Sequence, residues 1–250
     1  MRSISKFATV ILLVATVAGC SAGGGSSDAT RQDAKIGDAE MKAGNPDVAL
    51  RLADETLVRS PNDAGALTRR GSALTALGRL DEARETLQKA VSVEPRDIEA
   101  RLALGRVQLP VDPPAAEASF QEVLRQDGQN AAAWNNLGIA RDLQGHHAEA
   151  AGAYRKAIAA APEMAAARVN LALSLAILGQ GHEAIGLLRP LAEQPGATRK
   201  VRENYAAVLA MTGDRQAAEH ILAANMPANE LAPALDVLAS LRTPGESVTR

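Results

Sequence analysis

One spacing constrains this chain more than any other feature: small residues recur every 34 positions. The glycines of this series are Gly44, Gly78, Gly145, Gly179 and Gly213, and the alanines are Ala49, Ala83, Ala150, Ala184 and Ala218. In both series the steps are 34, 67, 34 and 34, where 67 is one step of 34 and one of 33. A fixed period of this size indicates an array of stacked helical hairpins.

Composition favours the same fold class. Hydrophobic residues make up 46% of the 250 residues but aromatic residues only 2%, so Ala, Leu and Val supply most of the apolar mass. Such side chains suit closely packed helices better than sheets. We therefore expect an all-α fold.

The clearest copy of the repeat runs from Trp134 to Pro162 and reads W-x2-L-G-x6-G-x4-A-x3-Y-x2-A-x4-P. It resembles the tetratricopeptide repeat, whose signature positions are occupied here by Trp134, Leu137, Gly138, Ala150, Tyr154, Ala157 and Pro162. Arg141 departs from the pattern, because an aromatic residue is common at its position. The resemblance implies a right-handed superhelix of antiparallel helix pairs. Gly138 and Ala150 would lie where the two helices approach closely, so Trp134 and Leu137 are predicted to be core rather than site.

About six repeats fit between residues 30 and 229, and a capping helix is expected at 230–241, followed by a flexible tail at 242–250. The repeat boundaries are 30–63, 64–97, 98–130, 131–164, 165–198 and 199–229. The third repeat is one residue short and carries "PVDPP" (Pro110 to Pro114) in place of the turn glycine. We expect a rigid turn there and a second helix that starts late.

The N-terminus predicts export and lipidation. Arg2 and Lys6 precede an apolar run from Phe7 to Ala18, which is typical of a signal peptide over 1–19. The sequence Val17-Ala18-Gly19-Cys20 resembles the lipobox of bacterial lipoproteins, with Cys20 as the lipidated residue. The alternative is an ordinary signal peptide with an incidental cysteine.

Lipidation at Cys20 implies attachment to a membrane through covalent diacylglycerol and acyl chains. Residues 20–29, which include "SAGGGSSD", are predicted to form a flexible tether. Because Ser21 rather than Asp follows the cysteine, the resemblance implies the periplasmic face of the outer membrane.

Other classes of function find little support in the residues. The formal net charge is −2 and there is no basic stripe, which argues against a nucleic-acid partner. No phosphate-binding loop, metal-ligand spacing or catalytic constellation is present, so we expect neither enzymatic activity nor a cofactor. His146 and His147 would need His182 from the next repeat to bind a metal, and solvated turn residues are the preferred interpretation.

The inner surface is the candidate site, because the first helices of such repeats line it. Asn136, Asn170 and Asn204 occupy equivalent positions, 34 residues apart, and Asn135 lies beside the first of them. Their spacing resembles the asparagine ladder with which some tetratricopeptide superhelices hold an extended peptide. An amide can donate and accept together, which matches a peptide group. In the alternative interpretation, these amides only tie neighbouring helices together.

Apolar residues accompany the amides on the inward positions of the later repeats. They are Ile139, Leu143, Val169, Leu173, Ile177, Ala207 and Met211. The first two repeats instead place polar residues there, namely Arg31, Asp38, Lys42, Thr68, Ser72 and Thr75. We therefore predict a groove that is polar near the tether and apolar in its C-terminal half, where a bound protein, superhelix closure or a dimer would cover the apolar side chains.

The segment from Leu187 to Ile221 narrows the resemblance further. Its "PGATRKVRENYA" entry into a repeat and its "GDRQAAE" turn and second helix resemble the lipoproteins of the tight-adherence (Flp pilus) assembly apparatus, the TadD type. Tyr205 departs mildly from that pattern, which often has Leu. The resemblance implies a pilotin-like role toward an outer-membrane secretin or another pilus-assembly component. A type IV pilus pilotin, a β-barrel assembly lipoprotein or a cell-wall synthesis scaffold would share the same features.

Overall fold

The structure of the chain is a computed structural model that describes residues 23–224 and 226–241. The predicted signal peptide, Cys20 and the tail at 242–250 lie outside these residues. The helices are α1 (Gly23–Ala43), α2 (Pro46–Arg59), α3 (Ala64–Ala76), α4 (Leu80–Val93), α5 (Ile98–Gln108), α6 (Pro113–Gln126), α7 (Ala131–Leu143), α8 (His147–Ala160), α9 (Ala165–Ile177), α10 (Gly181–Ala192), α11 (Arg199–Thr212), α12 (Arg215–Leu222) and α13 (Ala228–Ser240).

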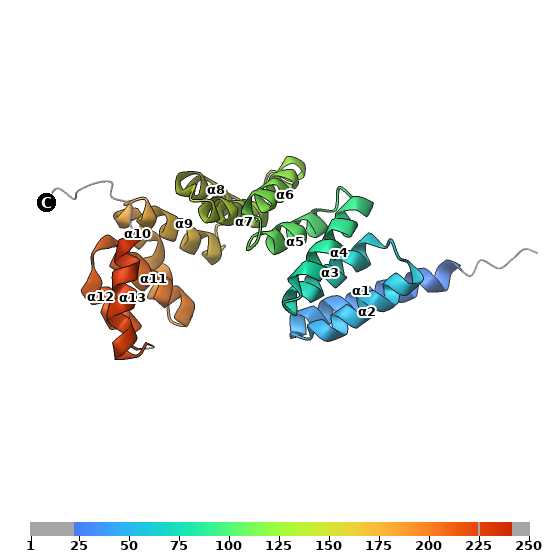
Figure 1. Cartoon of the computed structure of the whole chain (residues 1–250), viewed down its shortest axis with the longest axis horizontal. Helices are drawn as coiled ribbons and strands as arrows, with labels where there is room; N and C mark the ends of the chain where they lie inside the picture. Colours follow the sequence, from blue (N-terminus) through green and yellow to red (C-terminus); the bar gives the residue numbers. More distant parts are fainter. Residues whose placement is uncertain (1–22, 225, 242–250) are drawn as a thin grey trace, which may run out of the picture.

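The described residues form six antiparallel helix pairs and a thirteenth helix, without a strand, which confirms the all-α prediction. Each pair packs mainly on the pair before and after it, and α13 covers α11 and α12 at the end of the array. The pairs follow an arch, with α1 to α4 at one end and α9 to α13 at the other (Figure 1). The capping helix expected at 230–241 is α13.

The turns form where the sequence supplies glycine. Gly44, Gly78, Gly145, Gly179 and Gly213 all have φ between 75° and 98°, a left-handed conformation that is costly for residues with a Cβ. These are the five glycines of the 34-residue series. The period therefore marks the points where the first helix ends and the chain reverses, in every repeat except the third.

Side chains at the other helix ends fix where the first helices begin. Asp63, Asp97 and Asn130 precede α3, α5 and α7, and each side chain accepts a hydrogen bond from the backbone N–H three residues later. Thr198 does the same for α11. Such N-caps satisfy a backbone donor that the helix itself leaves unpaired.

The third repeat corrects one expectation. Its second helix, α6, does not start late: it begins at Pro113, the first residue after the N-cap Asp112. Proline suits this position, because the first helical N–H has no partner inside the helix. The side chain of Asp112 accepts a hydrogen bond from the N–H of Ala115. The third repeat is shorter because of its first helix: α5 has 11 residues, whereas α7, the first helix of the next repeat, has 13.

The beginning of α1 differs from the predicted tether at 20–29. The helix starts at Gly23 and includes three consecutive glycines, which have low helix propensity. Asp28 and Arg31 form an ion pair one turn apart, and Arg59 of α2 pairs with Asp33. Residues 23–29 therefore continue the first helix of repeat one.

Each of two central pairs is held together by a large side chain packed against a glycine. A Cβ placed on Gly138 would lie 2.3 Å from Cε1 of Tyr154, and one on Gly105 would lie 2.5 Å from Cε1 of Phe120. Leu137, Tyr154 and Phe120 are no more than 2% exposed. The close approach predicted at Gly138 is therefore confirmed, and Leu137 belongs to the core.

The core is divided along the array into clusters. The largest spans residues from Ala150 to Leu235, a second joins α2 to α5, and a third, which includes Phe120 and Leu137, lies between them. Successive first helices pack on one another on either side of this middle region, whereas α5 and α7 make little contact. Across this junction, Arg141 and Gln144 donate hydrogen bonds of 2.9 Å to the carboxylate of Glu117.

Candidate functional site

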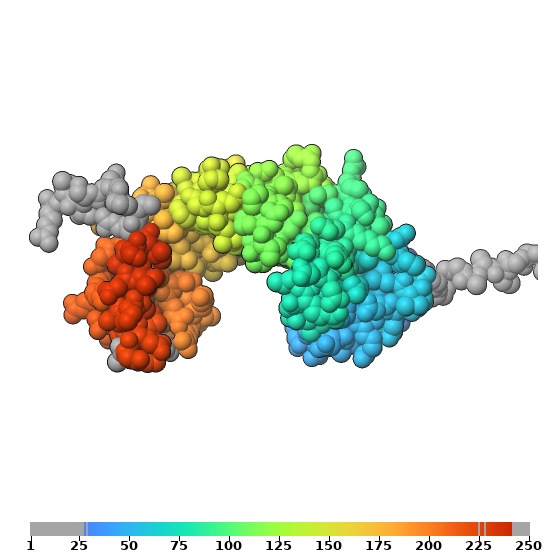
Figure 2. Space-filling view, viewed as in Figure 1, coloured from blue at the N-terminus to red at the C-terminus, as the bar shows by residue number. Residues whose placement is uncertain are grey.

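The arch is hollow on one side, between its two ends (Figure 2). The first helices of the repeats follow one another along this inner side (Figure 1), and each except α5 packs directly on the next one. They are α1, α3, α5, α7, α9 and α11. Two inward positions of each repeat, four residues apart and on the first helix except for Pro110, which follows α5, form what we call the inner ridge. Along the chain these positions are Asp38 and Lys42, Ser72 and Ala76, Arg106 and Pro110, Ile139 and Leu143, Leu173 and Ile177, and Ala207 and Met211.

Repeats one to three present a polar groove on this side. A cavity of about 370 Å³ is lined by Asp38, Met41, Lys42, Arg69, Ser72 and Glu99, which come from α1, α3 and α5. Three first helices thus contribute to one concavity. Its lining agrees with the polar groove predicted for repeats one and two, and Glu99 extends this groove to repeat three.

Repeats four and five present aliphatic side chains at the same positions. Leu143 is 57% exposed, and Ile139, Leu173 and Ile177 are half-buried beside the large core cluster. The successive first helices α7 and α9 therefore each carry two aliphatic residues that are one turn apart on the same face of the helix.

Two of the predicted apolar site residues are buried in this structure. Val169 is 8% exposed and Met211 is 4% exposed, and both belong to the core. The expectation that they face water is wrong, because α9 and α11 pack against their neighbouring helices, which cover those positions.

The predicted asparagines do not share one environment. Nδ2 of Asn170 donates a hydrogen bond of 3.0 Å to Oδ1 of Asn135, which joins α9 to α7. Asn135 and Asn136 are buried, and the Nδ2 of Asn136 finds no hydrogen-bond partner among the described residues. Asn135 and Asn170 therefore act as a tie between helices, the alternative role considered for these amides.

Asn204 lies in a separate concavity near the C-terminal end. A cavity of about 270 Å³ is lined by Arg199, Glu203, Asn204, Ala207, Leu222, Met226, Ala234 and Leu238, from α11 to α13 and the segment that joins α12 to α13. The structure thus places Asn204 apart from Asn135 and Asn170. The partner-binding role of the three equivalent asparagines stays a prediction.

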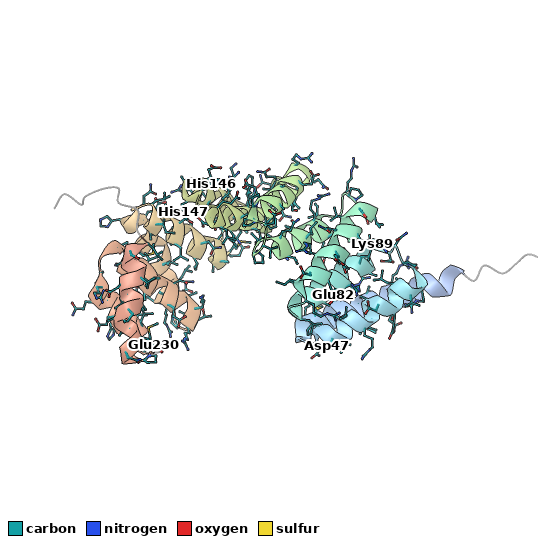
Figure 3. The ribbon with its side chains drawn as sticks, viewed as in Figure 1. Asp47, Glu82, Lys89, His146, His147 and Glu230 are labelled. Atoms are coloured by element: carbon teal, nitrogen blue, oxygen red, sulfur yellow. The ribbon has the colours of Figure 1, made fainter. Side chains whose placement is uncertain are left out.

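Sequence reasoning missed a polar cluster around Asp142. Its carboxylate accepts hydrogen bonds from Tyr154 (2.8 Å) and Ser174 (2.6 Å), and lies 2.9 Å from Nδ1 of His147. His147 is therefore not the solvated turn residue that was expected, although His146 beside it is exposed (Figure 3). The cluster joins α7, α8 and α9. Because Asp142 and Ser174 are 32 residues apart, they are not equivalent positions of the repeat, and the period gave no signal for the cluster.

The chemistry of this cluster is structural. Burial, the charge of Asp142 and the hydrogen bond to Asp142 together raise the pKa of Tyr154 well above its ordinary value, so its hydroxyl stays protonated and donates. The serine hydroxyl bonds to the carboxylate rather than to the imidazole, so the three residues do not form a nucleophilic triad.

Trp134 also has an architectural role. Its Nε1 donates a 2.9 Å hydrogen bond to the carbonyl of Gly128, in the loop between repeats three and four. Arg101 and Arg168 occupy the equivalent positions of the neighbouring repeats and donate to the carbonyls of Pro95 and Pro162. At all three positions a side-chain N–H donates to the carbonyl six residues earlier, although the residue type differs.

The described part of the chain contains no group of three or more His, Cys, Asp or Glu side chains that could hold a metal ion. Among its helices none is both long enough and apolar enough to cross a membrane.

Solved structures with the same fold cover most of this chain. PilW, described as a widely conserved type IV pilus biogenesis factor, superposes with a TM-score of 0.72 at 22% identity, over 82% of this chain and 97% of its own. PilF of Pseudomonas aeruginosa also gives a TM-score of 0.72, at 16% identity over 85% of this chain and 99% of its own. MamA is 29% identical over 62% of this chain and 91% of its own, with a TM-score of 0.54. At these identities PilW and PilF show the fold alone.

Curated relatives match only a part of the chain. The FK506-binding protein-like protein of Rattus norvegicus is 36% identical over 83 residues, which are 33% of this chain and 24% of that protein. Cellulose synthase operon protein C of Xanthomonas axonopodis pv. citri is 36% identical over 85 residues, or 34% of this chain and 6% of that protein. The chain thus covers about a quarter or less of the length of these relatives.

The repeat itself is matched over most of the described residues. The tetratricopeptide repeat family matches residues 35–100, 112–165 and 140–198, which together exceed half of the chain. These ranges contain most of the turn glycines and the Gly138–Tyr154 contact described above. The chain belongs to the tetratricopeptide repeat family.

Proposed function

We propose that this protein is a lipid-anchored periplasmic scaffold that binds a protein segment on its inner surface during assembly of a Flp (tight-adherence) pilus apparatus. Its partner would be the outer-membrane secretin or another pilus-assembly component, toward which it acts like a pilotin. The observation that carries the binding role is the inner ridge of repeats four and five. There Leu143 stays 57% exposed and three further aliphatic side chains are half-buried.

One exposed and three half-buried aliphatic side chains on successive repeats favour a binding surface over a purely structural one. Burying apolar surface gains roughly 25 cal/mol per Å², and the free protein forgoes this gain at Leu143. The half-buried neighbours Ile139, Leu173 and Ile177 extend the same strip. A partner segment laid along α7 and α9 would cover all four side chains.

The pilus assignment rests on the segment from Leu187 to Ile221 and on the lipobox that ends at Cys20. A type IV pilus pilotin is the second candidate. The observation that favours it is the similarity in fold to PilW over 82% of this chain. Adaptors of β-barrel assembly or of cell-wall synthesis are compatible with the same surface.

The binding role is tested by placing a charge on the strip. Leu143→Asp should abolish co-purification of the secretin from detergent-solubilised envelope and should lower the amount of secretin multimers. Val58→Asp is the matched control: Val58 is 83% exposed and lies on α2, a second helix on the other side of the array. Retention of the secretin by the Leu143→Asp variant would refute this surface as its binding site.

The anchor is tested separately. Cys20→Ser should release a folded protein into the periplasmic fraction, because acyl chains hold a lipoprotein on the membrane. Secretin multimers should fall in that strain even though the repeats are intact. If the Ser variant still fractionates with outer membrane, the protein is held there by something other than lipid.

A further inference from the structure

The inner ridge changes its chemistry once along the array. In repeats one to three it carries Asp38, Lys42, Ser72, Ala76, Arg106 and Pro110, and in repeats four and five it carries four aliphatic residues. The change falls at the junction where α5 and α7 make little contact. A polar surface on repeats one to three and an aliphatic surface on repeats four and five therefore follow one another along the inner side of the arch.

The cavity of the first surface is lined by two basic and two acidic side chains, and the basic excess of this surface comes from Lys35 and Arg106 on its flanks. Lys42 and Arg69 line its cavity with Asp38 and Glu99. Lys35 lies one turn before Asp38 on the same face of α1, and Arg106 lies two turns after Glu99 on the same face of α5. Lys35, Lys42, Arg69 and Arg106 thus outnumber Asp38 and Glu99. The chain as a whole has more acidic than basic residues, 29 against 27.

Among the described residues, none of these basic groups forms an ion pair, although Asp38 and Glu99 line the same cavity. The ion pairs of the described residues include Arg59 with Asp33 and Arg70 with Asp54, but none of the six charged groups of the groove. A cluster of unpaired basic groups attracts an acidic ligand and repels a basic one, and the attraction weakens as salt increases.

From this juxtaposition we infer the chemistry of the partner segment: it is acidic where it lies on repeats one to three and aliphatic where it lies on repeats four and five. This inference rests on the proposed function and adds the class of sequence that is recognised. The aliphatic strip supplies affinity by burial, and the basic groove selects the sign of the charge beside it.

Synthetic peptides of equal length test this inference directly on the full chain carrying Cys20→Ser. One peptide joins a Glu/Asp block to a Leu/Ile block, the second replaces the acids with Lys, and the third replaces the aliphatic residues with Ser and Gln. Each is made in both block orders, and binding is measured by fluorescence anisotropy at low and at physiological salt. The acidic–aliphatic peptide should bind at least tenfold more tightly than either of the others, and its advantage should shrink with salt.

Variants then locate the two blocks. Lys42→Glu with Arg69→Glu should weaken the acidic–aliphatic peptide about tenfold and strengthen the lysine peptide, whereas Leu143→Asp should weaken both. The matched control for charge is Arg51→Glu with Arg96→Glu, since both residues are exposed and neither lines the groove. Val58→Asp is the control for the apolar change, and thermal melts confirm that each variant is folded.

Three outcomes overturn the inference: equal binding of acidic and lysine peptides, no binding of any peptide, or equal effects of the groove and control charge reversals. The proposed function has its own readout, capture of the secretin through Leu143. If capture persists in any of these cases, the surface binds its partner but the assigned charge pattern is wrong. If capture fails while the acidic–aliphatic peptide binds as expected, the recognised chemistry stands and the secretin assignment falls.

Discussion

Gly138 sets the distance between the two helices of the fourth repeat. Because a Cβ there would lie 2.3 Å from the ring of Tyr154, Gly138→Ala forces the ring or the helix to move. Overpacking of this kind costs about 1–3 kcal/mol, and we expect the free energy of unfolding in urea to fall by that amount. Gly152, on the facing helix α8, is the control, because a Cβ added there would meet nothing within 4 Å. Gly152→Ala should stabilise by about 0.5–1 kcal/mol.

The chain itself suggests how to relieve this strain. At the equivalent positions, repeats five and six combine alanine with leucine, as Ala172 with Leu188 and Ala206 with Leu222. Adding Tyr154→Leu to Gly138→Ala should therefore recover part of the loss that packing causes. An unchanged stability of the Gly138→Ala single variant would mean that the contact is looser than the structure indicates.

The contribution of Tyr154 to the free energy of unfolding depends on pH in the alkaline range. Its pKa is raised in the folded protein by burial and by Asp142, so the folded state keeps the proton when the unfolded chain loses it. The stabilisation is complete below the ordinary tyrosine pKa of about 10 and is lost above it, by roughly 1.4 kcal/mol per pH unit. Urea unfolding between pH 9 and about 11.5 should show this slope.

Tyr154→Phe is the comparison that isolates the effect, because other groups also titrate in this range. The difference in unfolding free energy between the two proteins should be constant below a pH of about 10 and should shrink above it. A difference that does not change with pH would show that the phenol is free to ionise in the folded state.

At the scale of the helix, α9 lacks the side-chain N-cap that the first helices α3, α5, α7 and α11 have. Met164 precedes α9 with φ −69° and ψ 88°, close to the geometry of Asn130 before α7 with φ −67° and ψ 97°, yet it offers no side-chain acceptor. Met164→Asp should therefore cap α9 and raise the free energy of unfolding by about 0.5–2 kcal/mol. Asn130→Ala should lower it by a similar amount, and urea unfolding of both variants measures the pair. A destabilised Met164→Asp would mean that the packing of the methionine outweighs the cap it lacks.

The helices themselves were predictable from the sequence because the residues at each helix end determine where the helix begins and stops. A left-handed turn demands glycine at Gly145, a cap demands a side-chain acceptor at Asn130, and both recur with the period. The beginning of α1 was not predictable in this way, because its glycines oppose a helix locally. The regular start of α6 was missed because Pro113 was read as an obstacle, although the first turn of a helix accepts proline.

The site was predicted less completely than the fold. The polar and aliphatic halves of the inner ridge follow from the register alone. The burial of Val169 and Met211, the bond from Asn170 to Asn135 and the cluster around Asp142 depend on how adjacent repeats are rotated against each other. A period in the sequence indicates which positions are equivalent, but it does not indicate how far each repeat is rotated relative to the next.

For the whole molecule, the divided core predicts local stability. Leu74 and Leu175 stand at equivalent positions of repeats two and five, and both are fully buried, one in each of the two outer clusters. Each change to Ala costs about 2–5 kcal/mol in a well-packed core. Leu74→Ala should speed amide hydrogen exchange in α1 to α4 and leave α9 to α12 protected, and Leu175→Ala should do the reverse. Equal loss of protection along the chain in both variants would show a single cooperative unit.

The nearest-neighbour packing of the hairpins also determines how the molecule responds to load. No sheet clamps the two ends of the described array together, so tension along the chain peels hairpins away one at a time instead of shearing them apart. Each released hairpin of the 34-residue period adds roughly 110–120 Å of extended chain. Under tension the array is therefore expected to lengthen in steps, one hairpin at a time, while the repeats that are still folded keep their packing.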